Sequence, residues 1–105
     1  MKKVINGKVF DTETATELLS WGHGNIYDFR YIRETLYKTK KGKYFLYGVG
    51  GPLTSYAVRV SSSETSGSSN ITHMTSKDAL TWVEENFENV SDLILEEFSD
   101  LLELA

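Results

Sequence analysis

Short apolar runs alternate with turn signals over the first half of the chain, and this pattern predicts β-hairpins. Residues 3–10 hold two such runs on either side of Asn6-Gly7, and both turn residues accept the positive φ angles of a type I′ turn. Residues 29–39 and 43–49 are rich in β-branched and aromatic side chains and flank a Lys-Lys-Gly turn. We therefore expect two antiparallel hairpins here.

Three further runs extend this pattern. The threonine-rich residues 14–21 fit a strand at least as well as a helix, and residues 56–60 and 71–74 are also expected strands. The Ser/Gly stretch 61–70 is of low complexity and is expected to form a mobile loop. Together the runs predict an antiparallel sheet of four or five strands over about 3–74, arranged as a meander of hairpins.

From Thr75 onward the apolar spacing changes to that of a helix. Thr75 suits an N-cap, and Asp78 occupies the third helical position of a capping box. Apolar residues then recur every three or four positions at Leu80, Val83, Phe87, Val90, Ile94, Phe98 and Leu101. This spacing predicts one amphipathic helix over about 76–103, roughly 42 Å long. The spacing does not decide whether this helix is continuous or broken near Asn89. The expected fold is a single α+β domain, residues 1–105, with the long helix packed on the sheet.

Composition narrows the class of protein. The 105-residue chain has no cysteine, which excludes disulfides, thiolate metal sites and cysteine nucleophiles. No apolar run is long enough for a signal peptide or a membrane span, so a cytoplasmic protein without membrane contact is expected. His23 and His73 lack metal-ligand spacing. No metal, cofactor or catalytic residue is expected, and acid–base cleavage of RNA by these histidines is a minor alternative.

Charge is segregated along the chain. The net charge is −4, yet residues 1–59 contain ten Lys or Arg against five Asp or Glu, whereas residues 84–105 contain eight acids and no base. The acids are Glu84, Glu85, Glu88, Asp92, Glu96, Glu97, Asp100 and Glu103. Six of them would follow one face of the predicted helix, with Glu84 and Glu97 beside it.

An acid-only helix face has two interpretations. Solvated faces usually mix Lys with Glu because pairs four residues apart stabilise a helix, and this segment forgoes that stabilisation. Along a single helix the acids would be spaced at about one per 3.6 Å, close to the ~3.4 Å between phosphates of a nucleic-acid strand. The face is therefore expected to bind a basic protein by mimicking nucleic acid; an ordinary solvated face is the alternative.

The hairpin at 29–49 carries the opposite charge. Its cations are Arg30, Arg33, Lys38, Lys40, Lys41 and Lys43, and Tyr37 and Tyr44 are interleaved with them. Cations combined with stacking aromatics are typical of surfaces that bind single-stranded RNA. The alternative is a soluble hairpin with cross-strand tyrosine pairs and lysines that protect its edge, or one that faces the acidic helix inside the fold.

Three segments together resemble a known group. They are NGKVFDTETA at 6–15, LYKTKKGKYFLYG at 36–48, and GGPL at 50–53 followed by Tyr56-Ala57. The combination resembles small proteins of plasmids, prophages and integrative elements of Firmicutes, some of which are similar to anti-CRISPR inhibitors of type II-A Cas9. The likeness covers about residues 3–85 and consists of strand and turn signatures, without catalytic motifs.

The resemblance implies a partner. Cas9 holds guide RNA and target DNA in basic channels. The implied function is a stoichiometric inhibitor that binds Cas9 or another basic nucleic-acid-binding protein and blocks guide loading or DNA binding. The alternatives are a direct RNA or DNA binder using the hairpin, a guide-RNA nuclease, and a dimerisation module using the leucine-rich end of the helix. Either a monomer or a homodimer is compatible with the sequence.

Overall fold

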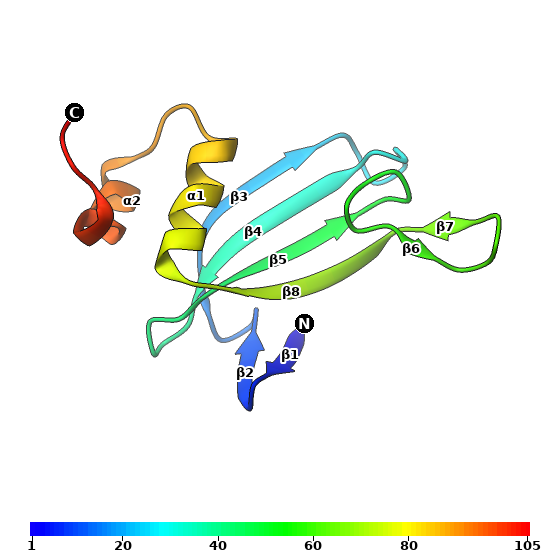
Figure 1. Ribbon diagram of the computed structural model, residues 1–105, viewed down its shortest axis with the longest axis horizontal. Coiled ribbons are helices and arrows are strands. Elements are labelled where there is room, and N and C mark those ends of the chain that lie inside the picture. Colours follow the sequence, from blue (N-terminus) through cyan, green and yellow to red (C-terminus); the bar gives the residue numbers. More distant parts are fainter.

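The centre of the protein is a four-stranded antiparallel sheet, described here from a computed structural model of residues 1–105 (Figure 1). Its strands are β3 (Thr16–His23), β4 (Ile32–Lys38), β5 (Tyr44–Gly50) and β8 (Ser68–Met74), in the order β3-β4-β5-β8. The predicted hairpin of residues 29–49 is confirmed as β4 and β5. The predicted return of residues 71–74 to the sheet edge is confirmed as well.

The N-terminal hairpin forms as predicted but does not join this sheet. β1 (Lys2–Ile5) and β2 (Lys8–Asp11) pair as a separate two-stranded sheet. Asn6 and Gly7 have φ angles of 52° and 75°, so both turn residues are in the left-handed region that a type I′ turn requires. The expected continuous meander is thus wrong, because the hairpin packs as its own layer against the sheet.

Phe10 anchors this layer. It is 1% exposed and contacts Phe45 edge to face, with the ring centroids 5.6 Å apart. Ile71 completes the small cluster, and Lys3 Nζ donates a 3.2 Å hydrogen bond to the Ile71 carbonyl at the sheet edge. The hairpin therefore covers one face of the sheet beside β8. It also explains why residues 44–47 are apolar or aromatic without alternation, since β5 is covered on both faces.

A third small sheet lies beyond the C-terminal end of β5 and the N-terminal end of β8. β6 (Val58–Arg59) and β7 (Thr65–Ser66) pair in a short hairpin. The stretch 61–70, expected to be a loop, thus contains β7 and the first residues of β8. The molecule extends 49 Å along its longest axis because this hairpin and the C-terminal helices lie at opposite ends (Figure 1).

The prediction of one long C-terminal helix is wrong. The segment instead forms α1 (Ser76–Asn86), α2 (Asp92–Glu97) and a 3-10 turn, η1 (Ser99–Leu101). The start of α1 is as predicted: Thr75 and Asp78 exchange two 3.1 Å hydrogen bonds in a capping box. None of these helices combines the length and apolar character needed to cross a membrane.

The break has a physical cause in the size of the sheet. A continuous helix over 76–103 would be roughly 42 Å long, whereas a seven-residue strand spans about 23 Å. Much of its apolar stripe would then project past the sheet. Instead α1 ends at Asn86, because the extended backbone of the C-cap Phe87 (φ −132°, ψ 127°) stops the helix, and the chain turns before α2 begins at Asp92. The reversal returns Ile94 and Phe98 to the core formed by α1 and the sheet.

Candidate binding surfaces

The acidic lobe, defined as residues 84–105, presents most of its charge to solvent. Of its eight acids, seven are exposed and only Glu97 is partly buried. The one ion pair in the structure joins Lys38 to Glu97, so the seven exposed carboxylates have no Lys or Arg partner. The exposed acids are Glu84 and Glu85 in α1, Glu88 in the linker, Asp92 and Glu96 in α2, and Asp100 and Glu103 after it.

These acids do not form a single stripe. The break at residues 87–91 changes the direction of the chain, as the separate α1 and α2 ribbons in Figure 1 show. A regular spacing close to that of phosphates depends on one continuous helix, and it is therefore lost across the break. The lobe presents a surface of unpaired charge in place of a linear ladder.

An apolar crevice of about 270 Å³ opens in the acidic lobe, between α1 and α2. Eight of its ten lining residues are apolar, among them Phe87, Val90 and Leu95. The other two are Glu84 and Glu88, both exposed. Spacing alone could not reveal this crevice, because it exists only after the helix has folded back. In the sequence, the leucine-rich second half of the C-terminal segment was the feature that indicated an additional apolar surface.

Tyr44, Lys38 and Glu97 attach the lobe to the sheet. Tyr44 Oη donates a 2.6 Å hydrogen bond to Glu97 Oε1, and Lys38 Nζ lies 2.5 Å from the same oxygen. Burial acts to raise the pKa of Glu97, but the hydrogen bonds from Lys38 and Tyr44 and the charge of Lys38 outweigh it and lower the pKa. One residue of the predicted acidic face and two of the predicted nucleic-acid-binding hairpin are therefore engaged with one another inside the fold.

The remaining residues of the predicted basic hairpin are dispersed. Arg30 precedes β4, and Arg33 lies near the start of β4, roughly 17 Å from Lys38 along the strand. Tyr37 is stacked on Phe45 at a centroid distance of 5.1 Å, and Tyr44 is buried beneath Phe98. The structure therefore does not bring the arginines, the turn lysines and these tyrosines onto one stacking surface.

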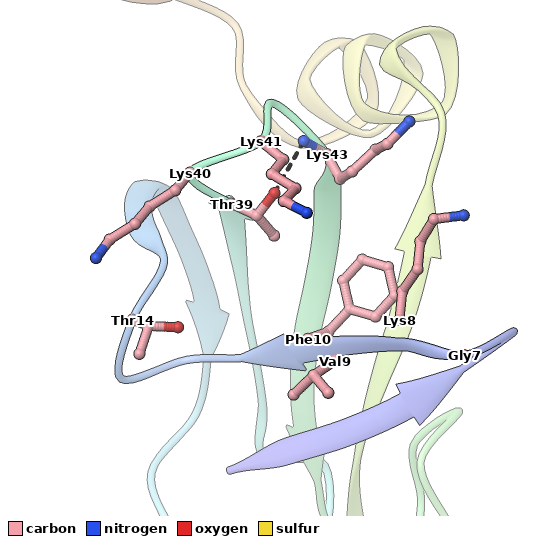
Figure 2. Close-up of a pocket in the computed structure, with 9 residues that line it drawn as sticks. All are labelled: Gly7, Lys8, Val9, Phe10, Thr14, Thr39, Lys40, Lys41 and Lys43. Carbon is pink, nitrogen blue, oxygen red and sulfur yellow. Dashed lines mark hydrogen bonds between the residues drawn. The ribbon is translucent and has the colours of Figure 1, made fainter.

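The turn lysines line one cavity of about 420 Å³, which we call the lysine groove. It lies between the β4–β5 turn and β2 (Figure 2). Its polar lining side chains are Lys8, Thr14, Thr39, Lys40, Lys41 and Lys43. Lys8 and Thr14 were not among the binding residues predicted from the sequence, because their position in the groove depends on how the N-terminal hairpin packs on the sheet.

The two histidines are far apart. His23 pairs with Ile32 at one end of the sheet, and His73 pairs with Phe45 near the other. Three strand spacings and five residue positions separate them, which corresponds to roughly 20 Å. They cannot act together on one phosphodiester bond, so the two-histidine nuclease has no geometric support.

Comparisons with known proteins identify no relative. No protein-family model, curated protein or solved structure matches the chain.

Proposed function

We propose that this protein is an inhibitor that uses its acidic lobe to dock onto a basic nucleic-acid-binding protein, with a Cas9 effector as the partner. The observation that carries the proposal is the apolar crevice with Glu84 and Glu88 in its lining. A partner that inserts an apolar side chain flanked by Lys or Arg would bury apolar surface and pair these carboxylates at the same time.

Unpaired charge supports the same assignment. Seven exposed acids without a basic neighbour repel one another, and a cationic partner would relieve that repulsion. The choice of Cas9 rests on the resemblance of residues 6–15, 36–48, 50–53 and 56–57 to small mobile-element proteins, some of which are similar to type II-A anti-CRISPR proteins. A Cas9 channel that accommodates guide RNA or DNA by backbone contacts offers the cations that the lobe lacks. Binding would block guide loading or DNA binding stoichiometrically, without catalysis.

The test is a pull-down of purified Cas9 with and without guide RNA, followed by measurement of affinity for variants of the acidic lobe. Glu84→Lys combined with Glu88→Lys should reduce affinity at least tenfold. Asp100→Lys combined with Glu103→Lys changes the net charge equally but lies outside the crevice lining, and it should cost far less. Leu95→Gln, at a 45% exposed crevice residue, should also weaken binding.

The outcomes separate the parts of the proposal. Equal losses for both charge-reversed pairs would mean that net charge, and not the crevice, drives binding. Unchanged affinity in every variant would contradict docking through the lobe. A failure of Cas9 to bind in either state would remove Cas9 as the partner. Recovery of Cas9 only without guide RNA would identify guide loading as the blocked step.

A further inference from the structure

We propose that the lysine groove binds the phosphate groups of a nucleic-acid backbone. This inference goes beyond the acidic-lobe proposal because it uses residues of β2 and the β4–β5 turn, none of which belongs to the lobe. It concerns the protein alone, so it can hold or fail independently of any Cas9 interaction.

The groove draws cations from two segments that are distant in sequence. Lys41 extends from the turn toward β2, whereas Lys8 rises from β2 on the side of β8 (Figure 2). Lys40 and Lys43 complete the set. A cavity of about 420 Å³ bordered by four lysines from two segments can place successive phosphates of one strand beside different ammonium groups.

The local charge balance favours an anion. No carboxylate lines the groove, and none of its four lysines takes part in an ion pair. Positive charges without a carboxylate partner attract an anion, and its binding lowers their electrostatic energy. The groove therefore presents uncompensated positive charge in a protein whose net charge is −4.

Two threonines supply further donors. Thr39 Oγ1 accepts a 3.0 Å hydrogen bond from the backbone N–H of Lys43, which leaves the hydroxyl hydrogen free to donate. Thr14 lies in the loop that follows β2, across the groove from the turn (Figure 2). Hydroxyl and ammonium donors are the groups that proteins use to contact phosphate oxygens.

The groove is expected to contact the backbone of the nucleic acid and not its bases. Phe10, its one aromatic lining residue, is 1% exposed and has no free face for stacking. Tyr37 is stacked on Phe45 and Tyr44 is buried. Binding is therefore expected to be insensitive to sequence and strongly dependent on salt.

The test is fluorescence anisotropy with labelled single-stranded RNA of two unrelated sequences, over a series of salt concentrations. Both sequences should bind with similar affinity, and the logarithm of affinity should fall against the logarithm of salt with a slope of about −3, as four neutralised phosphates predict. Lys8→Gln combined with Lys41→Gln should lower affinity at least tenfold and make the slope shallower by about 1.4.

Lys2→Gln combined with Lys77→Gln is the matched control, since it removes the same charge from lysines that do not line the groove. An equal loss in this control would overturn the proposal, as would no binding by the unmodified protein. Inorganic triphosphate, added at the same phosphate concentration as unlabelled RNA, should displace the probe less effectively than the RNA does. Equal displacement would assign the groove to small phosphate ligands and overturn the nucleic-acid assignment.

Discussion

Tyr44 and Glu97 are 53 residues apart in sequence and share a 2.6 Å hydrogen bond between β5 and the end of α2. The Tyr44 ring also stacks on Phe98, at a centroid distance of 5.4 Å. Burial, followed by the hydrogen bond to Glu97 and its charge, raises the pKa of the Tyr44 phenol. Because Lys38 pairs with the same carboxylate oxygen, these groups connect the acidic lobe to the sheet by both polar and apolar contacts.

This connection predicts that the stability of the lobe depends on pH in the acid range. The pKa of folded Glu97 lies below its ordinary value of 4.5, so its stabilisation is complete above that pH and is lost as pH falls through the lower folded pKa. Glu97→Gln should cost about 1–2 kcal/mol at pH 7 and flatten this dependence. Thermal unfolding at pH 7 and below pH 4 measures both effects. Glu96→Gln, an exposed neighbour without a partner, should behave like the unmodified protein.

Glu34 in β4 forms a second polar connection, to Tyr56 and to Trp82 in α1. One of its carboxylate oxygens accepts a 2.6 Å hydrogen bond from Tyr56 Oη, and the other accepts a 3.0 Å bond from Trp82 Nε1. Glu34→Ala leaves both donors without a partner and should cost about 2–3 kcal/mol. With Trp21→Phe as background, Trp82 is the sole tryptophan, so a shift of its fluorescence emission reports the lost bond. An unchanged spectrum would contradict the contact.

The Tyr56 phenol should lose its proton only at high pH, because it donates a hydrogen bond to Glu34. Burial, then the hydrogen bond to Glu34 and its charge, raises the pKa of Tyr56 above its ordinary value of 10.0. The stabilisation is fully present below pH 10 and is lost as pH rises through the folded pKa. Absorbance of phenolate during alkaline titration should show a late component, to which Tyr44 also contributes, and Tyr56→Phe should reduce its amplitude by one phenol. An amplitude that Tyr56→Phe leaves unchanged would contradict the contact with Glu34.

Gly48 is predicted to be intolerant of any side chain. A Cβ at this position would lie 1.6 Å from Tyr56 Oη and 1.9 Å from its Cζ, so the ring would have to move away from Glu34. Gly48→Ala should destabilise the fold by about 1–3 kcal/mol through this overlap. The double variant Gly48→Ala with Tyr56→Ala should lose less unfolding free energy than the two single variants lose together, because the smaller side chain at position 56 removes the overlap. Strict additivity in chemical denaturation would contradict this account.

Features set by local chemistry could be predicted from the sequence. The Asn6-Gly7 turn and the Thr75–Asp78 capping box depend on residues no more than three positions apart, and both form as expected. The placement of the N-terminal hairpin was not predictable in this way. Phe10 could have joined the edge of the main sheet or packed on its face, and alternation of apolar residues is compatible with either arrangement.

The candidate sites depend even more on tertiary structure. The lysine groove exists because Lys8 and Lys41, 33 positions apart, line one cavity once the hairpin has packed on the sheet. The pairing of Lys38 with Glu97 likewise depends on the chain reversal after α1. Charge composition predicted which kinds of surface to expect, but only the fold determines which charges remain free.

The break in the C-terminal segment can itself be tested with proline. Asp92 is the first residue of α2, where proline is tolerated, and the preceding Ser91 is extended (φ −68°, ψ 159°), as a residue before proline prefers. The backbone amide of Asp92 donates no hydrogen bond to another backbone group. Asp92→Pro should therefore change the free energy of unfolding by less than about 1 kcal/mol. Glu84→Pro, inside α1, removes a helical hydrogen bond and should cost about 3 kcal/mol or more. A continuous helix would predict the larger cost for both variants, because both prolines would then lie in a helix interior. Chemical denaturation of the two variants distinguishes these possibilities, with Asp92→Ala separating the effect of the lost charge from that of the proline ring.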